Sequence, residues 1–351
     1  MIDAQAAPMS RQALTALCAG VALAAIVIGV GVYVLVSDDG IAAGAGDVIA
    51  YSCKERKNVW YAVCVMNTDG SEKQRLTKQL TTTDPAWSPD GRRIAFTRNE
   101  DVGEFTTFTD DDVFVMDADG DNVQQLTPEV DGSSSGQPAW SPDGQAIVYV
   151  RGPSIASAVV SATPLAFGEL HVMEADGSKR KRLTRGEPDA APAWSPGGRD
   201  IVFVRGHDLN KPSGDMDLFV VDAAGGTPRR LTHTSHSLET APAWSPDGAR
   251  IAFARSSSTS AFTGEVAILV IKREGSGESL VLRHKLFSET SYGLSWSPDG
   301  RSIVLETGDL DCTVVATIRV AKAQLRRLTS CIGPFRASVG PSWQPQVNPG
   351  G

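Results

Sequence analysis

A short pattern recurs five times along this chain, and it limits the possible folds more than any other feature. Each copy places Trp-Ser-Pro before a glycine-containing turn and a short apolar run, and the copies begin at Asp84, Gln137, Ala191, Ala241 and Gly293. Their tryptophans are separated by 53, 54, 50 and 52 residues, and a truncated copy surrounds Trp343. Such regular spacing is typical of structural repeats, so the chain is predicted to repeat one supersecondary unit.

Each repeat has the sequence pattern of four strands. Ser-Pro-Asp-Gly is a turn, because proline restricts φ and glycine tolerates a positive φ, so the flanking apolar runs are predicted to form a hairpin of strands one and two. A third strand, such as 112–116 or 218–221, is predicted after a variable loop. A fourth strand then follows a turn and ends with Leu-Thr. These pairs are Leu126-Thr127, Leu183-Thr184, Leu231-Thr232 and Leu328-Thr329. This arrangement is typical of one propeller blade.

The first unit indicates how the array ends. It starts near Ile49 and lacks a Trp-Ser-Pro strand, whereas the truncated copy at 339–343 has only that strand. Pairing the two would close six four-stranded antiparallel blades into a ring. We therefore predict an all-β, six-bladed β-propeller over residues 47–345, closed by the C-terminal strand and followed by a tail at 346–351. The repeated tryptophans are predicted to be buried between neighbouring sheets.

The Trp-Ser-Pro-Asp-Gly unit, with its Ile-Ala-Phe strand and terminal Leu-Thr, resembles the TolB-type propeller repeat, and the resemblance covers residues 47–345. It implies a propeller of the kind found in TolB, a soluble periplasmic protein that serves an envelope complex and carries a separate α/β domain. Similar propellers also precede serine-hydrolase domains in prolyl-oligopeptidase-like enzymes. The apolar N-terminal segment of this chain, and the lack of room for the α/β domain, depart from the TolB pattern.

The N-terminal region has the properties of a membrane anchor. The residues between Arg11 and Asp38 carry no formal charge and are mostly apolar. This segment is long enough to form a bilayer-spanning helix. We predict a short cytoplasmic N-terminus at 1–11, a transmembrane signal-anchor helix at 12–37 and a linker at 38–46. Arg11 before the span places the propeller outside the cytoplasmic membrane of a bacterium. A cleaved signal peptide is the alternative.

Four cysteines support the same compartment. Cys53 with Cys64 and Cys312 with Cys331 make two pairs that are each close in sequence, and disulfide bonds form in oxidising compartments. Both pairs are therefore predicted to be bridged, and four reduced core thiols are the alternative. The formal net charge of −8 disfavours nucleic-acid binding.

Length variation is confined to the loops after strands two and four, which share one face of a propeller, so we predict that this face binds the partner. At its edge, strand two ends in arginine four times, at Arg98, Arg151, Arg205 and Arg255. A guanidinium ring could bind an acidic partner through bidentate pairing. The alternative is internal pairing with acidic residues at the start of strand three, such as Asp112, Glu169, Asp215, Asp217 or Glu265.

No catalytic, metal-binding or cofactor-binding set is predicted. Gly132 to Gly136 matches the spacing of a nucleophile elbow, but that motif requires a strand, a turn and a helix. His233, His236 and Glu239 are a weak metal signal in one loop. The function predicted from the sequence is therefore non-catalytic docking of a protein, a peptide or a cell-envelope component. The alternatives are a ligand-sensing propeller, and then a hydrolase or lyase with its site in the central channel.

Overall fold

The structure is a computed structural model that describes residues 48–53, 61–78, 81–99, 111–128, 132–153, 167–207, 215–257, 265–285, 293–309, 312–330 and 341–345. Regular structure in these ranges is β-strand, apart from one 3-10 turn, η3 (Val320–Lys322). The all-β prediction is therefore confirmed. Within the same ranges no helix has the length and hydrophobicity needed to cross a bilayer, and the anchor predicted at 12–37 lies outside them.

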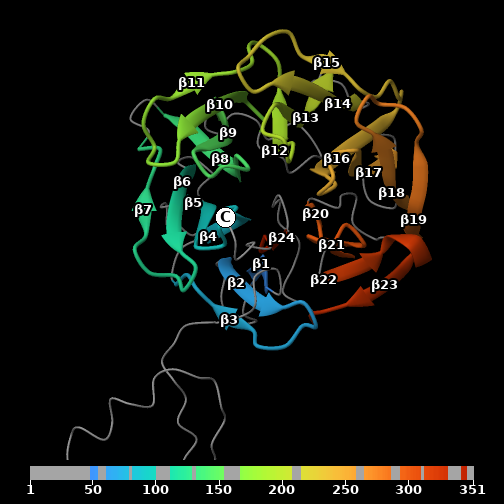
Figure 1. Ribbon diagram of the computed structural model, residues 1–351, viewed down its shortest axis with the longest axis horizontal. Coiled ribbons are helices and arrows are strands. Elements are labelled where there is room, and N and C mark those ends of the chain that lie inside the picture. Colours follow the sequence, from blue (N-terminus) through green and yellow to red (C-terminus); the bar gives the residue numbers. More distant parts are fainter. Residues whose placement is uncertain are drawn as a thin grey trace, which may run out of the picture. The chain divides into compact units, whose positions relative to one another are not determined.

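The strands form antiparallel sets of four, which we call blades and number in chain order (Figure 1). Blade 1 comprises β24 (Ser342–Trp343), β1 (Val48–Cys53), β2 (Ala62–Asn67) and β3 (Gln74–Arg75). Blade 2 comprises β4 (Thr81–Trp87), β5 (Arg93–Asn99), β6 (Asp111–Asp117) and β7 (Gln124–Gln125). Blade 3 comprises β8 (Ser133–Trp140), β9 (Ala146–Pro153), β10 (Glu169–Glu174) and β11 (Lys181–Arg182).

The second half of the chain repeats this order. Blade 4 comprises β12 (Asp189–Trp194), β13 (Asp200–His207), β14 (Asp215–Asp222) and β15 (Arg229–Arg230). Blade 5 comprises β16 (Ser237–Trp244), β17 (Arg250–Ser257), β18 (Glu265–Lys272) and β19 (Ser279–Lys285). Blade 6 comprises β20 (Leu294–Trp296), β21 (Ser302–Asp309), β22 (Cys312–Arg319) and β23 (Gln324–Arg327). One parallel pair, Met216 with Leu238, links blades 4 and 5.

The Ser-Pro-Asp-Gly turn forms the predicted hairpin between the first two strands of a blade. In blade 2 the Ser88 hydroxyl donates to Asp90 at 2.6 Å and accepts from the Arg93 amide at 2.9 Å. The Gly91 amide closes the turn on the Ser88 carbonyl at 2.9 Å with φ of 66°, a conformation that glycine adopts without steric cost. The hairpin is therefore determined by residues within one short segment.

The Leu-Thr pair has a different role from the predicted one. In blades 1 to 4 and in blade 6 the fourth strand ends before the Leu-Thr pair. There the threonine hydroxyl, in place of a backbone carbonyl, accepts the hydrogen bond from the third strand. Each Thr Oγ1 accepts from a third-strand amide at 2.8 to 2.9 Å, and the preceding leucine is buried. The donors and acceptors are Val63 to Thr77, Val113 to Thr127, Leu170 to Thr184, Leu218 to Thr232, and Val315 to Thr329.

The repeated tryptophans join neighbouring blades, as predicted, although Trp194 and Trp343 are only half-buried. Trp140, Trp244 and Trp296 are buried in hydrophobic clusters that contain residues of two adjacent blades. Each of these indoles donates to an alanine carbonyl of the preceding blade at 3.2 Å. Buried indole N–H groups need such an acceptor, so these three tryptophans contribute both apolar packing and one inter-blade hydrogen bond each.

The two ends of the repeat region meet in blade 1. In the antiparallel pair of β24 and β1, Ile49 lies opposite Trp343 and Ala50 opposite Ser342. Blades 6 and 1 also contact each other at their outer edges, where Arg326 donates to the Asp69 carbonyl at 3.1 Å. Gly70 there has φ of 87°, and a Cβ at this position would lie 2.7 Å from the Leu328 carbonyl oxygen. Only glycine fits so close to the neighbouring backbone.

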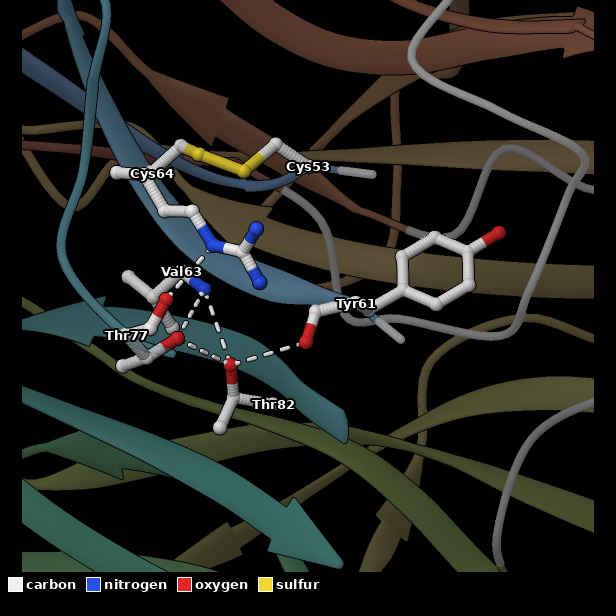
Figure 2. The surroundings of a disulfide bond; sticks show 7 residues. Cys53, Tyr61, Val63, Cys64, Thr77 and Thr82 are labelled. Atoms are coloured by element: carbon white, nitrogen blue, oxygen red, sulfur yellow. Dashed lines mark hydrogen bonds between the residues drawn. A yellow bond between two sulfur atoms is a disulfide. The ribbon is translucent and has the colours of Figure 1, made fainter. Parts of the chain in front are cut away.

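Cys53 and Cys64, one of the two predicted pairs, form a disulfide bond between β1 and β2 (Figure 2). Beside it, the Val63 amide donates to Thr77 at 2.9 Å and to Thr82 of blade 2 at 3.0 Å. The second predicted pair, Cys312 with Cys331, lies outside the described side chains.

Replacing Cys53 and Cys64 together with alanine is expected to lower the free energy of unfolding by about 3 kcal/mol, because the bond restricts a short loop in the unfolded chain. Urea denaturation without reductant measures this loss. The single variants Cys53→Ala and Cys64→Ala are matched controls and should lose as much as the double variant, since each already removes the bond. An unchanged midpoint in the double variant would show that the bond contributes nothing to stability.

Candidate functional site

The arginines that end strand two lie at corresponding positions in β5, β9, β13 and β17, and Arg205 in β13 makes a buried ion pair. Arg205 Nε donates to Asp189 Oδ1 at 2.6 Å and Nη2 donates to Oδ2 at 2.9 Å, a bidentate arrangement. The guanidinium also lies 5.4 Å from the Phe203 ring centre and 5.0 Å from that of Phe219. Asp189 is fully buried, and burial raises its pKa, although the bonds from Arg205 act in the opposite direction.

Arg255 makes the corresponding contacts in blade 5. Its Nε and Nη2 donate to one oxygen of the fully buried Glu239 at 3.0 and 2.7 Å, and Nη1 donates to Glu278 at 2.7 Å. Glu239 also accepts from Thr234 at 2.9 Å and from the Leu218 amide at 3.2 Å. Burial raises the pKa of Glu239, again against the effect of its hydrogen bonds. Glu239, part of the weak metal signal, is thus bonded within the protein.

The acidic partners of these two arginines are not the predicted ones. The sequence suggested acids of strand three, whereas Asp189 and Glu239 begin strand one of the same blades. The sheet register explains the difference, because Asp189 lies directly opposite Arg205 and Glu239 opposite Arg255. Asp217 also lies opposite Arg205, on β14, but its carboxylate accepts from Arg230 of β15.

The other two arginines have different surroundings. The Arg98 guanidinium lies 4.1 Å from the centre of the Phe114 ring, opposite Asp112 in the β5–β6 register. Arg151 is half-buried and lies opposite Glu169. The four predicted residues therefore share one position in the repeat, and the side chains of Arg98, Arg205 and Arg255 contact side chains of their own blades.

Arg151 lines a cavity of about 460 Å³ beside blade 3. Phe167 and Pro188 form apolar walls, and Glu169 and His171 add polar groups. Burial alone would raise the pKa of Glu169, but hydrogen bonds from the Gly186 amide at 2.9 Å and from Arg182 at 3.2 Å outweigh it and lower that pKa. The cavity thus combines apolar walls with an ionised carboxylate, a composition suited to a small ligand.

Glu306 of β21 is a buried acid that the sequence analysis did not identify. Its side chain is almost fully buried, and burial raises its pKa to about 8, with a further contribution from the negative charge of Asp84. A hydrogen bond from the Ser52 amide has the opposite effect. The Asp84 charge acts from blade 2 and Ser52 belongs to blade 1, so only the assembled fold reveals this environment.

Glu306 is expected to make the protein less stable as the pH rises from about 4.5 to about 8. Its folded pKa of about 8 exceeds the ordinary value of 4.5, so in this range the native state holds a proton that the unfolded state releases. The loss is about 1.4 kcal/mol per pH unit within the window. Urea denaturation at pH 5, 6.5 and 8 should show that Glu306→Gln removes this dependence. Equal pH dependence in both chains would contradict the prediction.

The described residues contain no group of three or more His, Cys, Asp or Glu side chains arranged to hold a metal ion. The serines between Gly132 and Gly136 lie at the start of β8, and the following segment is the rest of a strand. A nucleophile elbow needs a helix after the turn, so this segment is not one.

Four-stranded antiparallel blades, packed through repeated tryptophans, define a β-propeller. The chain belongs to the TolB beta propeller domain family, whose model matches residues 46–211 and 105–348. The resemblance inferred from the repeats is thereby confirmed.

Two curated relatives share parts of the propeller sequence. An uncharacterized peptidase, YuxL of Bacillus subtilis, is 29% identical over 162 residues, which are 37% of this chain and 23% of that protein. A TolB homolog of Chlorobaculum tepidum is 30% identical over 142 residues, 40% of this chain and 27% of that protein. The chain therefore spans less than a third of the length of either relative.

Solved structures agree on the fold. The crystal structure of TolB from Acinetobacter baumannii matches with a TM-score of 0.64 at 20% identity, over 86% of this chain and 68% of that one. A putative TolB from Agrobacterium tumefaciens matches with a TM-score of 0.58 at 18% identity, over 85% of this chain and 94% of that one. These likenesses concern the fold alone.

Proposed function

We propose that this protein is a non-catalytic docking scaffold built on a closed six-bladed ring. The pairing of β24 with β1 supports closure, as do the contacts between blades 6 and 1 at Gly70 and Arg326. A closed ring leaves only short sheet edges exposed, which suits a rigid platform for binding loops.

The ring is displayed outside the cytoplasmic membrane of a bacterium by a single transmembrane helix at 12–37. The uncharged apolar sequence supports this placement, and the Cys53–Cys64 bond supports an oxidising compartment. The linker at 38–46 can span at most about 30 Å, so the propeller remains close to the lipid.

The docking surface is the face that carries the variable loops, and it accepts a protein, a peptide or a cell-envelope component. The observation that carries this proposal is the pair of buried ion pairs, Arg205–Asp189 and Arg255–Glu239, which fix the strand ends beneath those loops. Rigid strand ends beneath loops of variable sequence are typical of recognition surfaces. In this proposal the arginines hold the loop bases in position, and the loops supply the contacts.

Paired surface variants test the choice of face. Glu187 and His233 are exposed near the starts of strand one on the loop face, and Arg92 and Gln145 are exposed at the opposite turns. In cross-linking with an envelope extract, Glu187→Lys with His233→Glu should reduce capture of the partner. The matched pair Arg92→Glu with Gln145→Lys should leave capture unchanged. Equal effects of the two pairs would reject the loop face as the docking surface.

Ligand sensing is the second candidate, favoured by the cavity of about 460 Å³ beside blade 3. A sensor should show a ligand-dependent rise in Tm, because binding to the native state alone stabilises it. Phe167→Ala should reduce that rise if the cavity holds the ligand. An unchanged rise in this variant would exclude the cavity as the sensing site.

A further inference from the structure

The cavity of about 460 Å³ beside blade 3 has walls that backbone hydrogen bonds between blades 3 and 4 hold in place. β9, the residues around the start of β10, and residues 186–188 before β12 line it. Gly168 and Asp189 form an antiparallel bridge there, with amide-to-carbonyl distances of 3.0 and 2.8 Å. The Gly206 amide also donates to the Pro188 carbonyl at 3.0 Å. The walls are therefore positioned before any ligand binds, as in most small-molecule sites.

Two carboxylates line this cavity. Glu169 accepts from the Gly186 amide and from Arg182, and its lowered pKa keeps it ionised at neutral pH. Glu187 is exposed, and no hydrogen bond or ion pair joins its side chain to another residue in the described part of the chain. Its negative charge adds to the effect of burial in raising the pKa of Asp189. The ammonium group of a ligand is therefore favoured beside Glu187 and Glu169.

A guanidinium and an imidazole line the same cavity. Arg151 is half-buried near the end of β9 and lies opposite Glu169 in the β9–β10 register. Its guanidinium carries several N–H donors, so it can bind a ligand carboxylate in addition to groups of its own blade. The ring centre of His171 lies 5.6 Å from that of Tyr149, and its imidazole supplies a further polar group. The carboxylate of a ligand is thus favoured beside Arg151.

The combination of these groups selects one kind of ligand. A purely cationic ligand would be repelled by Arg151, and a purely anionic one by Glu169 and Glu187, whereas a zwitterion satisfies both kinds of wall group. Phe167 and Pro188 supply apolar surface, and the volume lies within the usual range for small-molecule sites, about 300–1,000 Å³. Amino acids and dipeptides with apolar side chains have this composition, two opposite charges on an apolar body.

We propose that the cavity binds an apolar amino acid or dipeptide, whose ammonium group pairs with Glu187 and Glu169 and whose carboxylate pairs with Arg151. The apolar side chains of the ligand pack against Phe167 and Pro188. This binding rests on the second proposed function, ligand sensing at the same cavity, and deepens it by naming the class of ligand.

Calorimetric titration of the full chain with L-leucyl-L-leucine tests the proposal, and the dipeptide should bind at a single site. N-acetylation removes its positive charge and C-terminal amidation removes its negative charge. Each modification should weaken binding about tenfold, the effect of losing one charge-assisted hydrogen bond. L-leucine is titrated in parallel, and binding of either compound supports the proposal.

Two variants connect each ligand charge to its wall group. Glu187→Gln should weaken binding of the dipeptide about tenfold and leave binding of the N-acetyl form unchanged, because that form has no ammonium group. Arg151→Gln should weaken binding of the dipeptide equally and leave binding of the amidated form unchanged. Glu72 and Arg92 are exposed and lie outside the cavity lining, so the matched controls Glu72→Gln and Arg92→Gln should bind like the unchanged chain.

Absence of binding by both L-leucine and the dipeptide would overturn the proposal, as would equal affinities of the dipeptide and its two modified forms. If Arg151→Gln does not fold, the modified forms and Glu187→Gln decide, because Glu187 is exposed and can be neutralised without opening the blade. A ligand of another class that raises Tm in the full chain but not in Phe167→Ala would leave ligand sensing intact and reject the zwitterion alone. Partner capture at the loop face is a separate readout and is unaffected.

Discussion

Arg205→Ala is expected to lower the free energy of unfolding by about 3–5 kcal/mol, because it leaves the fully buried Asp189 without its bidentate partner. Arg205 itself is 12% exposed, so water cannot replace the two lost hydrogen bonds without opening the end of β12. Urea denaturation at pH 7 measures the loss.

Arg199→Ala is the matched control for this prediction. Arg199 pairs with Asp222 in the same blade, but the two side chains are 80% and 44% exposed, and such pairs contribute about 0–1 kcal/mol. The double variant Arg205→Leu with Asp189→Leu removes both charges and should recover much of the lost stability. A loss of less than 1 kcal/mol in Arg205→Ala would refute a structural role for the pair.

Removing residues 341–351 is expected to abolish cooperative unfolding of the propeller or to cost about 3 kcal/mol or more, because the half-buried Trp343 and the whole of β24 are lost together. The deletion removes β24 and Trp343, and it exposes the edge of β1 from Ile49 onwards. An unpaired, apolar edge promotes association between chains, so a higher apparent mass in size-exclusion chromatography should accompany the loss.

The chain ending at Pro345 serves as the control, because it keeps β24 and differs from the deletion by five further residues, 341–345. It should unfold cooperatively and elute at the mass of the full chain. If the longer deletion behaves in the same way, β24 is dispensable and the closed ring is wrong.

Local features of the fold could be predicted from the sequence, whereas most of the site could not. The hairpin at Ser88–Gly91 depends on residues within a few positions, so its turn chemistry is visible in the sequence. The sequence did not predict that the Thr127 hydroxyl accepts a hydrogen bond from the Val113 amide, because threonine is also common within strands.

The acidic partners of the buried arginines could not be predicted from the sequence either. The spacing of the repeats identified Arg205 and Arg255, but the choice between acids of strand one and strand three depends on which neighbouring strand places a carboxylate within reach. Glu306 is a stronger case, because its environment includes Asp84 and Ser52 of other blades. A sequence signal existed, since Glu306 is an acid within the apolar run of a second strand.

The pairing of Ile49 with Trp343 also constrains how the molecule is made. During synthesis β1, β2 and β3 are made long before β24, the strand that completes their sheet. Contacts so distant in sequence slow folding, so nascent chains pass through a long period with one sheet incomplete. Refolding of the denatured propeller should therefore remain incomplete until β24 has paired with β1.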